Sequence, residues 1–329
     1  MTPAGAFEEY DVAAEPDIRM NSSLRAEINL RCPSDGRAYR ELAESWFTRA
    51  VAAFAGPLGE GFHHDLDLTE PALSTDGDAP LGAPGTLWAD FVYYRARRGR
   101  ARLVQTHWSP GNWQRFREEL ENRPADAQLE LSLLGADGRP DEPWLAVSVK
   151  RENQAPDVVS LVAIRTTEEF QDPATVDEAQ RRWESSFRSF VERYDPVWYA
   201  NIADDSEHTT GRTALEDGLG LLLEDTLPEL GSTLRGYAWL TVCSPGVTAA
   251  LGGVPALRAS GAFAEVAALP GGGAWLKATD RVLAYTDSRV RAVFRALAPA
   301  LPPGKPTPSL TWETPRLAFQ DPDDLTDAT

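Results

Sequence analysis

The chain contains 329 residues, and 50 aspartates and glutamates against 32 lysines and arginines give it a formal net charge of −18. A surface this negative repels phosphate backbones, so direct nucleic-acid binding is excluded as an expected function. The apolar runs are far shorter than the roughly 20 residues of a membrane-spanning helix, and the N-terminus lacks the features of a secretory leader. We therefore expect a cytoplasmic protein without a membrane segment, in which Cys32 and Cys243 are buried and reduced.

Composition divides the chain into two terminal arms and two folded stretches. Residues 1–23 predict a flexible acidic arm, and residues 302–329 form a proline-rich acidic tail that is expected to bury little apolar area and to be dispensable for folding. Between the arms, the patterns predict an α+β fold with antiparallel sheets and helices packed on them. A break near 171–174 separates a first domain, 24–170, from a second domain, 174–301.

The first domain is predicted to begin with a half-buried strand, because polar and apolar residues alternate over 24–30. Apolar residues at three-to-four spacing then predict an amphipathic helix over 37–55, with Ser34 or Asp35 as its cap. Aromatic and β-branched runs joined by short turns indicate further strands in antiparallel pairs. These strands cover 87–94, 128–134, 144–150 and 158–164, and a helix covers 110–121.

The second domain contains an apolar strand over 236–243, which is predicted to be central and to place Trp239 and Leu240 in the core. Residues 44–54 recur in similar form at 184–194. Two diverged copies of one α+β unit would produce this similarity, and so would the apolar spacing that any two amphipathic helices share. The other predicted elements are helices over 176–194, 213–223, 246–251, 254–260 and 288–297, a strand over 198–202 and a hairpin over 265–278.

Two clusters of titratable residues are candidates for chemistry. His63, His64 and Asp65 offer ligands to a metal such as zinc, although neighbouring side chains in an extended loop point apart. The second cluster joins a predicted strand to a helix and lacks the glycine and the alternation of a calcium loop, which favours an acidic connector. It contains Asp204, Asp205, Glu207 and His208.

A basic run over 97–102 contains four arginines. In so acidic a chain, these arginines are expected to pair with the chain's own carboxylates, and docking of a phosphate or an acidic partner is the alternative. The glycine patterns of dinucleotide and phosphate loops and the nucleophile elbow of esterases do not occur in the sequence. We predict no cofactor.

The C-terminal half combines an aromatic-leucine strand over 236–245, Leu-Gly-Gly at 251–253 and a glycine-rich hairpin over 271–278. In these motifs, residues 235–300 resemble the immunity-type domain of unknown function found beside polymorphic and type VI secretion toxins in bacteria. The resemblance implies a protein without catalysis that neutralises a toxin by occupying its active site. Because the motifs consist of scaffold residues, the resemblance transfers no catalytic residue.

The leading hypothesis is therefore a bacterial immunity protein that binds a cognate toxin. An acidic inhibitor associates faster with a basic partner, so a basic toxin is expected, with Asp204, Asp205 and Glu207 as predicted contact residues. Two alternatives stay open: a secretion-apparatus structural protein, and a hydrolase or transferase whose site is assembled from distant residues. The residues of that enzyme alternative are His63, His64, Asp65 and His208.

Overall fold

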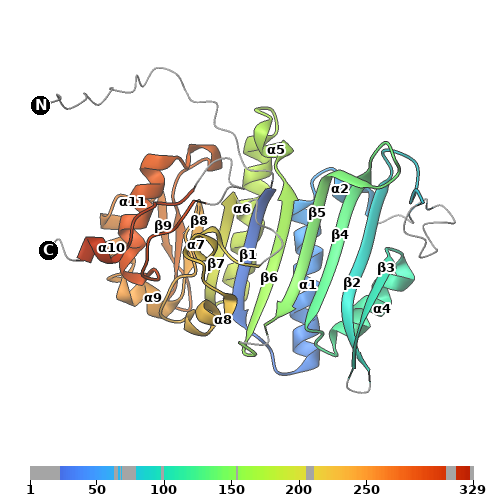
Figure 1. Cartoon of the computed structure of the whole chain (residues 1–329), viewed down its shortest axis with the longest axis horizontal. Helices are drawn as coiled ribbons and strands as arrows, with labels where there is room; N and C mark the ends of the chain where they lie inside the picture. Colours follow the sequence, from blue (N-terminus) through green and yellow to red (C-terminus); the bar gives the residue numbers. More distant parts are fainter. Residues whose placement is uncertain are drawn as a thin grey trace, which may run out of the picture.

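A single antiparallel sheet runs through the molecule. The computed structural model describes residues 23–62, 66, 68, 79–97, 100–152, 155–204, 211–308 and 316–326. In these residues the strand order is β3-β2-β4-β5-β6-β1-β7-β8-β10-β9, and every neighbouring pair is antiparallel (Figure 1). The predicted α+β fold with antiparallel pairing is confirmed.

The strands lie where the sequence predicts them, with one addition and one shortening. Residues 100–107, which include the end of the basic run, form an additional outer strand, β3, which pairs with β2 in a hairpin. The apolar strand over 236–243 is regular only in its second half, β8. The strands are β1 (Ser23–Arg31), β2 (Leu87–Arg97), β3 (Arg100–His107), β4 (Asp126–Leu134), β5 (Pro140–Arg151), β6 (Val158–Thr166), β7 (Val197–Asp204), β8 (Leu240–Cys243), β9 (Glu265–Ala268) and β10 (Ala274–Lys277).

Local capping explains where the main helices begin and end. The Asp35 side chain accepts a hydrogen bond from the Ala38 backbone amide and caps α1. The helix predicted over 213–223 is two short helices, because Gly220 adopts a left-handed φ of 69° and ends α7. The helices are α1 (Gly36–Phe54), α2 (Leu58–Gly61), α4 (Pro110–Leu120), α5 (Glu168–Gln171), α6 (Val176–Arg193), α7 (Ala214–Leu219), α8 (Leu223–Thr226), α9 (Pro245–Ala250), α10 (Gly253–Ala259), α11 (Asp287–Leu297) and α12 (Asp323–Thr326).

Both predicted domains contribute strands to the one sheet, and β1 joins them. This strand pairs with β6 on one side and with β7 on the other, so Ile28 lies opposite Leu161 and Ala200. The expected border at 171–174 falls between α5 and α6. The two stretches therefore share a continuous sheet and a common hydrophobic core, where the sequence suggested separate sheets.

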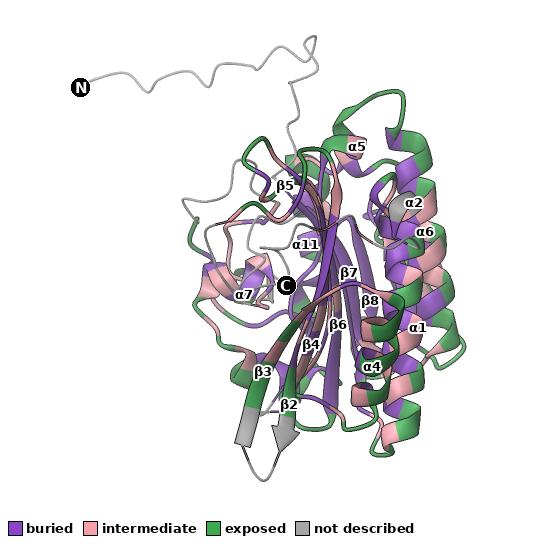
Figure 2. Cartoon of the chain, turned by 90° about the vertical axis from the view of Figure 1, so that its right-hand side faces the viewer, coloured by how far each residue is buried: buried purple, intermediate pink, exposed green. Residues whose placement is uncertain are grey.

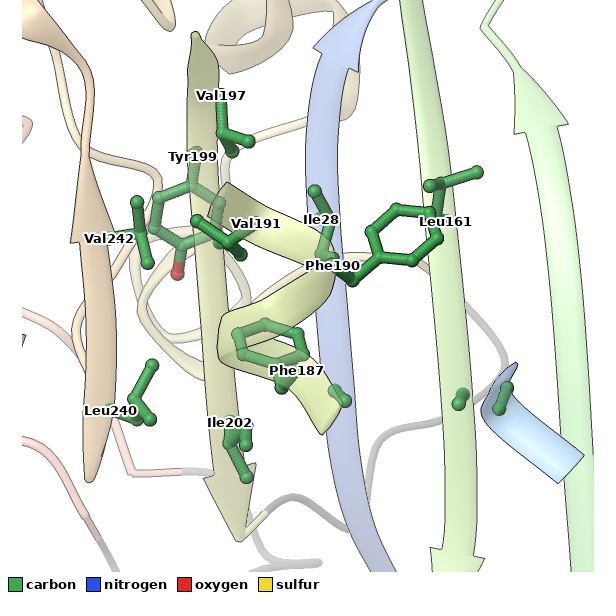
Figure 3. Packing of buried hydrophobic residues seen from close by; sticks show 14 of the residues in the cluster. Ile28, Leu161, Phe187, Phe190, Val191, Val197, Tyr199, Ile202, Leu240 and Val242 are labelled. Atoms are coloured by element: carbon green, nitrogen blue, oxygen red, sulfur yellow. The ribbon is translucent and has the colours of Figure 1, made fainter. Parts of the chain in front are cut away.

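The apolar face of the sheet is covered by α1, α4 and α6 (Figure 2). In the core, α6 lies across the middle strands, with Phe187 and Phe190 over the apolar side chains of β1 and β6 (Figure 3). Helices α1 and α6, which contain the two similar segments, pack on each other, and the centroids of the Trp46 and Phe190 rings are 5.1 Å apart. Edge-to-face packing of this kind adds to the burial of apolar area. The duplication itself stays a prediction.

Trp239 and Leu240 lie in the core, as predicted, and both are almost completely buried. The indole nitrogen of Trp239 donates a hydrogen bond to the Thr279 carbonyl at 2.9 Å. Cys32 and Cys243 are free and buried. Among the described helices, none combines the length and apolar character that crossing a bilayer requires.

The described part of the C-terminal tail is docked on the fold, contrary to the expectation that it buries little. Leu317 and Ala318 belong to the hydrophobic core, and the Ala318 backbone amide donates to the Tyr237 hydroxyl at 2.8 Å. Arg316 forms a 3.1 Å ion pair with Asp204. Sequence composition did not predict this docking because a few apolar residues suffice once a charged side chain anchors them.

Truncating the chain at Pro303 is therefore expected to destabilise it. Breaking a buried ion pair by removing one partner costs about 3–5 kcal/mol, and the loss of Leu317 adds to it. Arg316→Gln should reproduce a large part of the loss, whereas Lys305→Gln, an exposed change in the same tail, should leave the free energy of unfolding unchanged. Urea unfolding measures all three, and a truncated chain as stable as the full one would show that the docked tail contributes nothing.

Candidate binding surface

The second face of the sheet has two halves, and a buried ionic cluster closes one of them. The alternation in β1 places Arg25, Glu27 and Asn29 on the face opposite the helices. The sequence predicts that this face of β1 meets solvent. All three side chains are instead buried, because residues 211–236 lie over them.

Arg235 is the centre of the cluster. Its guanidinium forms a fork with the Glu216 carboxylate at 2.7 and 2.8 Å, donates to Asn29 Oδ1 at 2.8 Å, and also binds Glu27. Arg25 forms a 2.7 Å ion pair with Glu27. Burial alone raises the pKa of Glu27, but Arg235 and Arg25 outweigh burial and hold the pKa below its ordinary value.

A capping box places Glu216 in this cluster. The Thr213 hydroxyl accepts a hydrogen bond from the Glu216 backbone amide at 3.2 Å, and the Glu216 carboxylate accepts one from the Thr213 amide at 2.6 Å. The same carboxylate receives Arg235, so the cap of α7 also ties the helix to β1. The Thr-x-x-Glu pattern was the sequence signal for this arrangement. With exposed fractions of 1% or less at Arg235 and Glu216, the cluster is closed to a substrate and acts as a structural anchor.

Replacing Arg235 with Met should cost about 3–5 kcal/mol of unfolding free energy, because buried Glu216 loses its cationic partner and Glu27 keeps only Arg25. Arg281 offers the matched control, since its ion pair with Asp177 is exposed. Arg281→Met is expected to cost about 1 kcal/mol or less. Chemical unfolding of both variants checks the difference, and equal losses would contradict the anchoring role.

The other half of this face, over β3, β2, β4 and β5, forms what we call the open face. Figure 1 looks onto it, with α1 behind the strands and, in the described residues, no helix in front. Its central row contains His107, Asp90 and Glu130, which lie directly opposite one another on β3, β2 and β4. Directly paired residues of neighbouring strands point to the same side of a sheet.

Asp90 is the unusual member of this row. Only 3% of the residue is exposed, its Oδ2 atom accepts a 2.6 Å hydrogen bond from the Gln105 side chain, and its buried Oδ1 atom has no hydrogen-bond partner. Burial raises the pKa of Asp90, and the Gln105 hydrogen bond offsets this only in part. Burial and then the charge of Asp90 raise the pKa of Glu130. The row therefore holds two carboxylates that each lack a compensating cation among the described residues.

The hairpin β2–β3 carries exposed apolar side chains at the edge of the open face. Tyr94 and Leu103 lie opposite each other in the hairpin, with exposed fractions of 42% and 51%. Leu222, near α8, is the third large apolar side chain that is strongly exposed in the described residues. The outer strand β3 has no partner on its far side in the described sheet.

On the opposite side of the same hairpin, a cavity of about 230 Å³ lies against α4. Tyr93 and Val104 line it together with Arg95 and Arg115. Arg95, which precedes the basic run, forms an ion pair with Glu119 of α4. That the arginines of the run pair with the chain's own carboxylates stays a prediction.

Of the predicted site residues, Asp204 is the one that lies in the described part of the chain. Asp204 is buried at the end of β7 and paired with Arg316, so it is not the exposed contact residue that the acidic loop suggested. The remaining residues of the two clusters lie outside the described residues, and their roles stay predictions. These are Asp205, Glu207 and His208, and His63, His64 and Asp65. In the described part of the chain, no three His, Cys, Asp or Glu side chains are placed to hold a metal ion.

Comparisons with known proteins add little. No family model matches the chain, and no curated protein matches it. Two crystal forms of the ginseng major latex-like protein 151 from Panax ginseng align with 54% of this chain and all of theirs, at 12% and 11% sequence identity. The TM-score is 0.17 for both, a value at which the likeness carries no argument.

The carboxylate pair of the open face makes a prediction about pH. Because the pKa values of Asp90 and Glu130 are raised in the folded chain, the ionised pair opposes folding, and this penalty grows as pH rises above about 4. Asp90→Asn should therefore unfold at a higher temperature than the wild type at pH 7, by about 2–4 °C, and the difference should vanish near pH 4. Thermal unfolding at both pH values measures it, with Glu224→Gln as an exposed acidic control.

Proposed function

We propose that the protein is an immunity-type protein of the bacterial cytoplasm that binds and neutralises a cognate toxin through the open face. The observation that carries the proposal is the exposed pair Tyr94 and Leu103 on the outermost hairpin. Neighbouring large apolar side chains on a protein surface are typical of interaction sites, and tyrosine is enriched among residues that dominate binding energy.

The hairpin β2–β3 suits an inhibitor because it offers two kinds of contact. In the sheet of the described residues, the outer strand β3 presents unpaired backbone donors and acceptors to an extended segment of a partner. Tyr94 and Leu103 provide apolar anchors on one side of it.

Charge and resemblance support a toxin as the partner. A net charge of −18 accelerates association with a basic protein and disfavours acidic partners. The resemblance of residues 235–300 to immunity-type domains supports the same class of partner. In this proposal those residues hold the scaffold together and the hairpin makes the contact.

The test begins with capture of the native protein's partner and its identification by mass spectrometry. Co-expression with the captured protein then measures protection: wild type should restore growth, and a Tyr94→Asp, Leu103→Asp double variant should not. We expect its dissociation constant to rise about 100-fold, as for the loss of two anchors worth roughly 1–2 kcal/mol each.

Leu222→Asp is the matched control, because Leu222 is as exposed as Leu103 but lies near α8. It should bind and protect like the wild type. If the captured protein is not toxic, or wild type gives no protection, the immunity function is wrong. If the double variant protects normally while folded, the hairpin is not the contact surface.

A further inference from the structure

The row of Asp90, Glu130 and His107 raises the question of what balances two adjacent carboxylates. Like charges directly opposite each other on neighbouring strands are destabilising. Such a pair costs stability in the isolated chain. Its presence therefore suggests a role in binding another molecule. The buried Oδ1 atom of Asp90, which has no hydrogen-bond partner, adds an unmet polar group to the same place.

Two cations of this face are engaged elsewhere. Lys150 of β5 forms a 3.2 Å ion pair with Glu152. Arg25, further along the face on β1, belongs to the buried ionic cluster. Among the described residues, Asp90 and Glu130 thus form no ion pair, and Gln105 is the only described hydrogen-bond donor to the Asp90 carboxylate.

Two tryptophans lie on the same side of the sheet as the carboxylate pair. Trp88 of β2 and Trp144 of β5 each lie opposite Ser132 of β4. This row is two residues along the strands from the row that contains Asp90 and Glu130. Tryptophan is the best aromatic partner for a cation, and a flanking apolar surface strengthens an ion pair by reducing its exposure to water. Glu130 is exposed and Asp90 is buried beside it, so a partner approaches the pair from the Glu130 side.

We infer that Asp90 and Glu130 form a receptor for one cationic side chain of the partner, an arginine in preference to a lysine. The inference rests on the proposed function and names the chemistry of the same face. An arginine guanidinium presents several donors in one plane, which matches two carboxylates on adjacent strands, whereas a lysine supplies a single point charge. The incoming cation pairs with the exposed Glu130 carboxylate, lies beside the Asp90 carboxylate and offsets the repulsion between the two.

The first experiment uses a small probe. N-acetyl-arginine amide is titrated into the full chain, and carboxyl carbon chemical shifts are followed by NMR, with the uncharged citrulline analogue and the lysine analogue as comparisons. Saturable shifts of the Asp90 and Glu130 carboxyls with the arginine probe are expected, weaker ones with lysine and none with citrulline. An Asp90→Asn, Glu130→Gln variant should bind at least about tenfold more weakly, while Glu224→Gln should bind normally.

Three outcomes of this titration overturn the inference. The first is the absence of saturable shifts at the pair up to the solubility limit of the arginine probe. The second is equal binding of the citrulline analogue, which would remove the role of charge. The third is saturable binding of Mg²⁺ that excludes the arginine probe, which would make the pair a metal site.

The second experiment uses the captured toxin and separates this inference from the proposed function. The Asp90→Asn, Glu130→Gln variant should weaken toxin binding at least about tenfold and reduce its dependence on salt, because a buried charge pair is lost. Normal binding by this variant, together with loss of binding in the Tyr94→Asp, Leu103→Asp variant, overturns the receptor and leaves the proposed function intact. Normal binding by both overturns the receptor and the assigned surface.

Discussion

The fork between Arg235 and Glu216, clamped onto Glu27 of β1, is the interaction on which the architecture depends. It lies on the central strand, where the sheet segments from both halves of the chain meet. Buried ion pairs contribute little net stability compared with apolar packing, but they tolerate only one arrangement of their partners. The cluster therefore fixes how residues 211–236 lie over the sheet, and it does so with a helix cap that forms locally.

The same interaction decides where the protein is open. By holding residues 211–236 over β1, the cluster closes one half of the second sheet face, whereas no described helix lies in front of β2 to β5. Polar and apolar side chains alternate along the strands, and the polar side has a different environment in each half of the sheet. In β1 it supplies an internal anchor, and in β2 and β4 it supplies Asp90 and Glu130, whose pKa values are raised by burial and, for Glu130, also by the charge of Asp90.

Prediction succeeded where local rules decide. The helix over 37–55 and the strand positions follow from periodicity and capping, and α1 and α6 lie close to their predicted bounds. It failed where charge was judged by composition. Asp204 was assigned to a contact surface because it begins an acidic loop, yet it is buried against Arg316. The environment of this charge comes from a distant segment of the chain.

The sequence by itself determined the elements, the antiparallel pairing and the apolar core around Trp239, because spacing and short turns act over a few residues. Only the tertiary structure decided that one sheet holds both halves, that the polar side of β1 is interior, and that Tyr94, Leu103, Asp90 and Glu130 share one open face. The reason is physical: which side of a strand meets water depends on what is packed above it, and those residues are up to about 200 positions away along the chain.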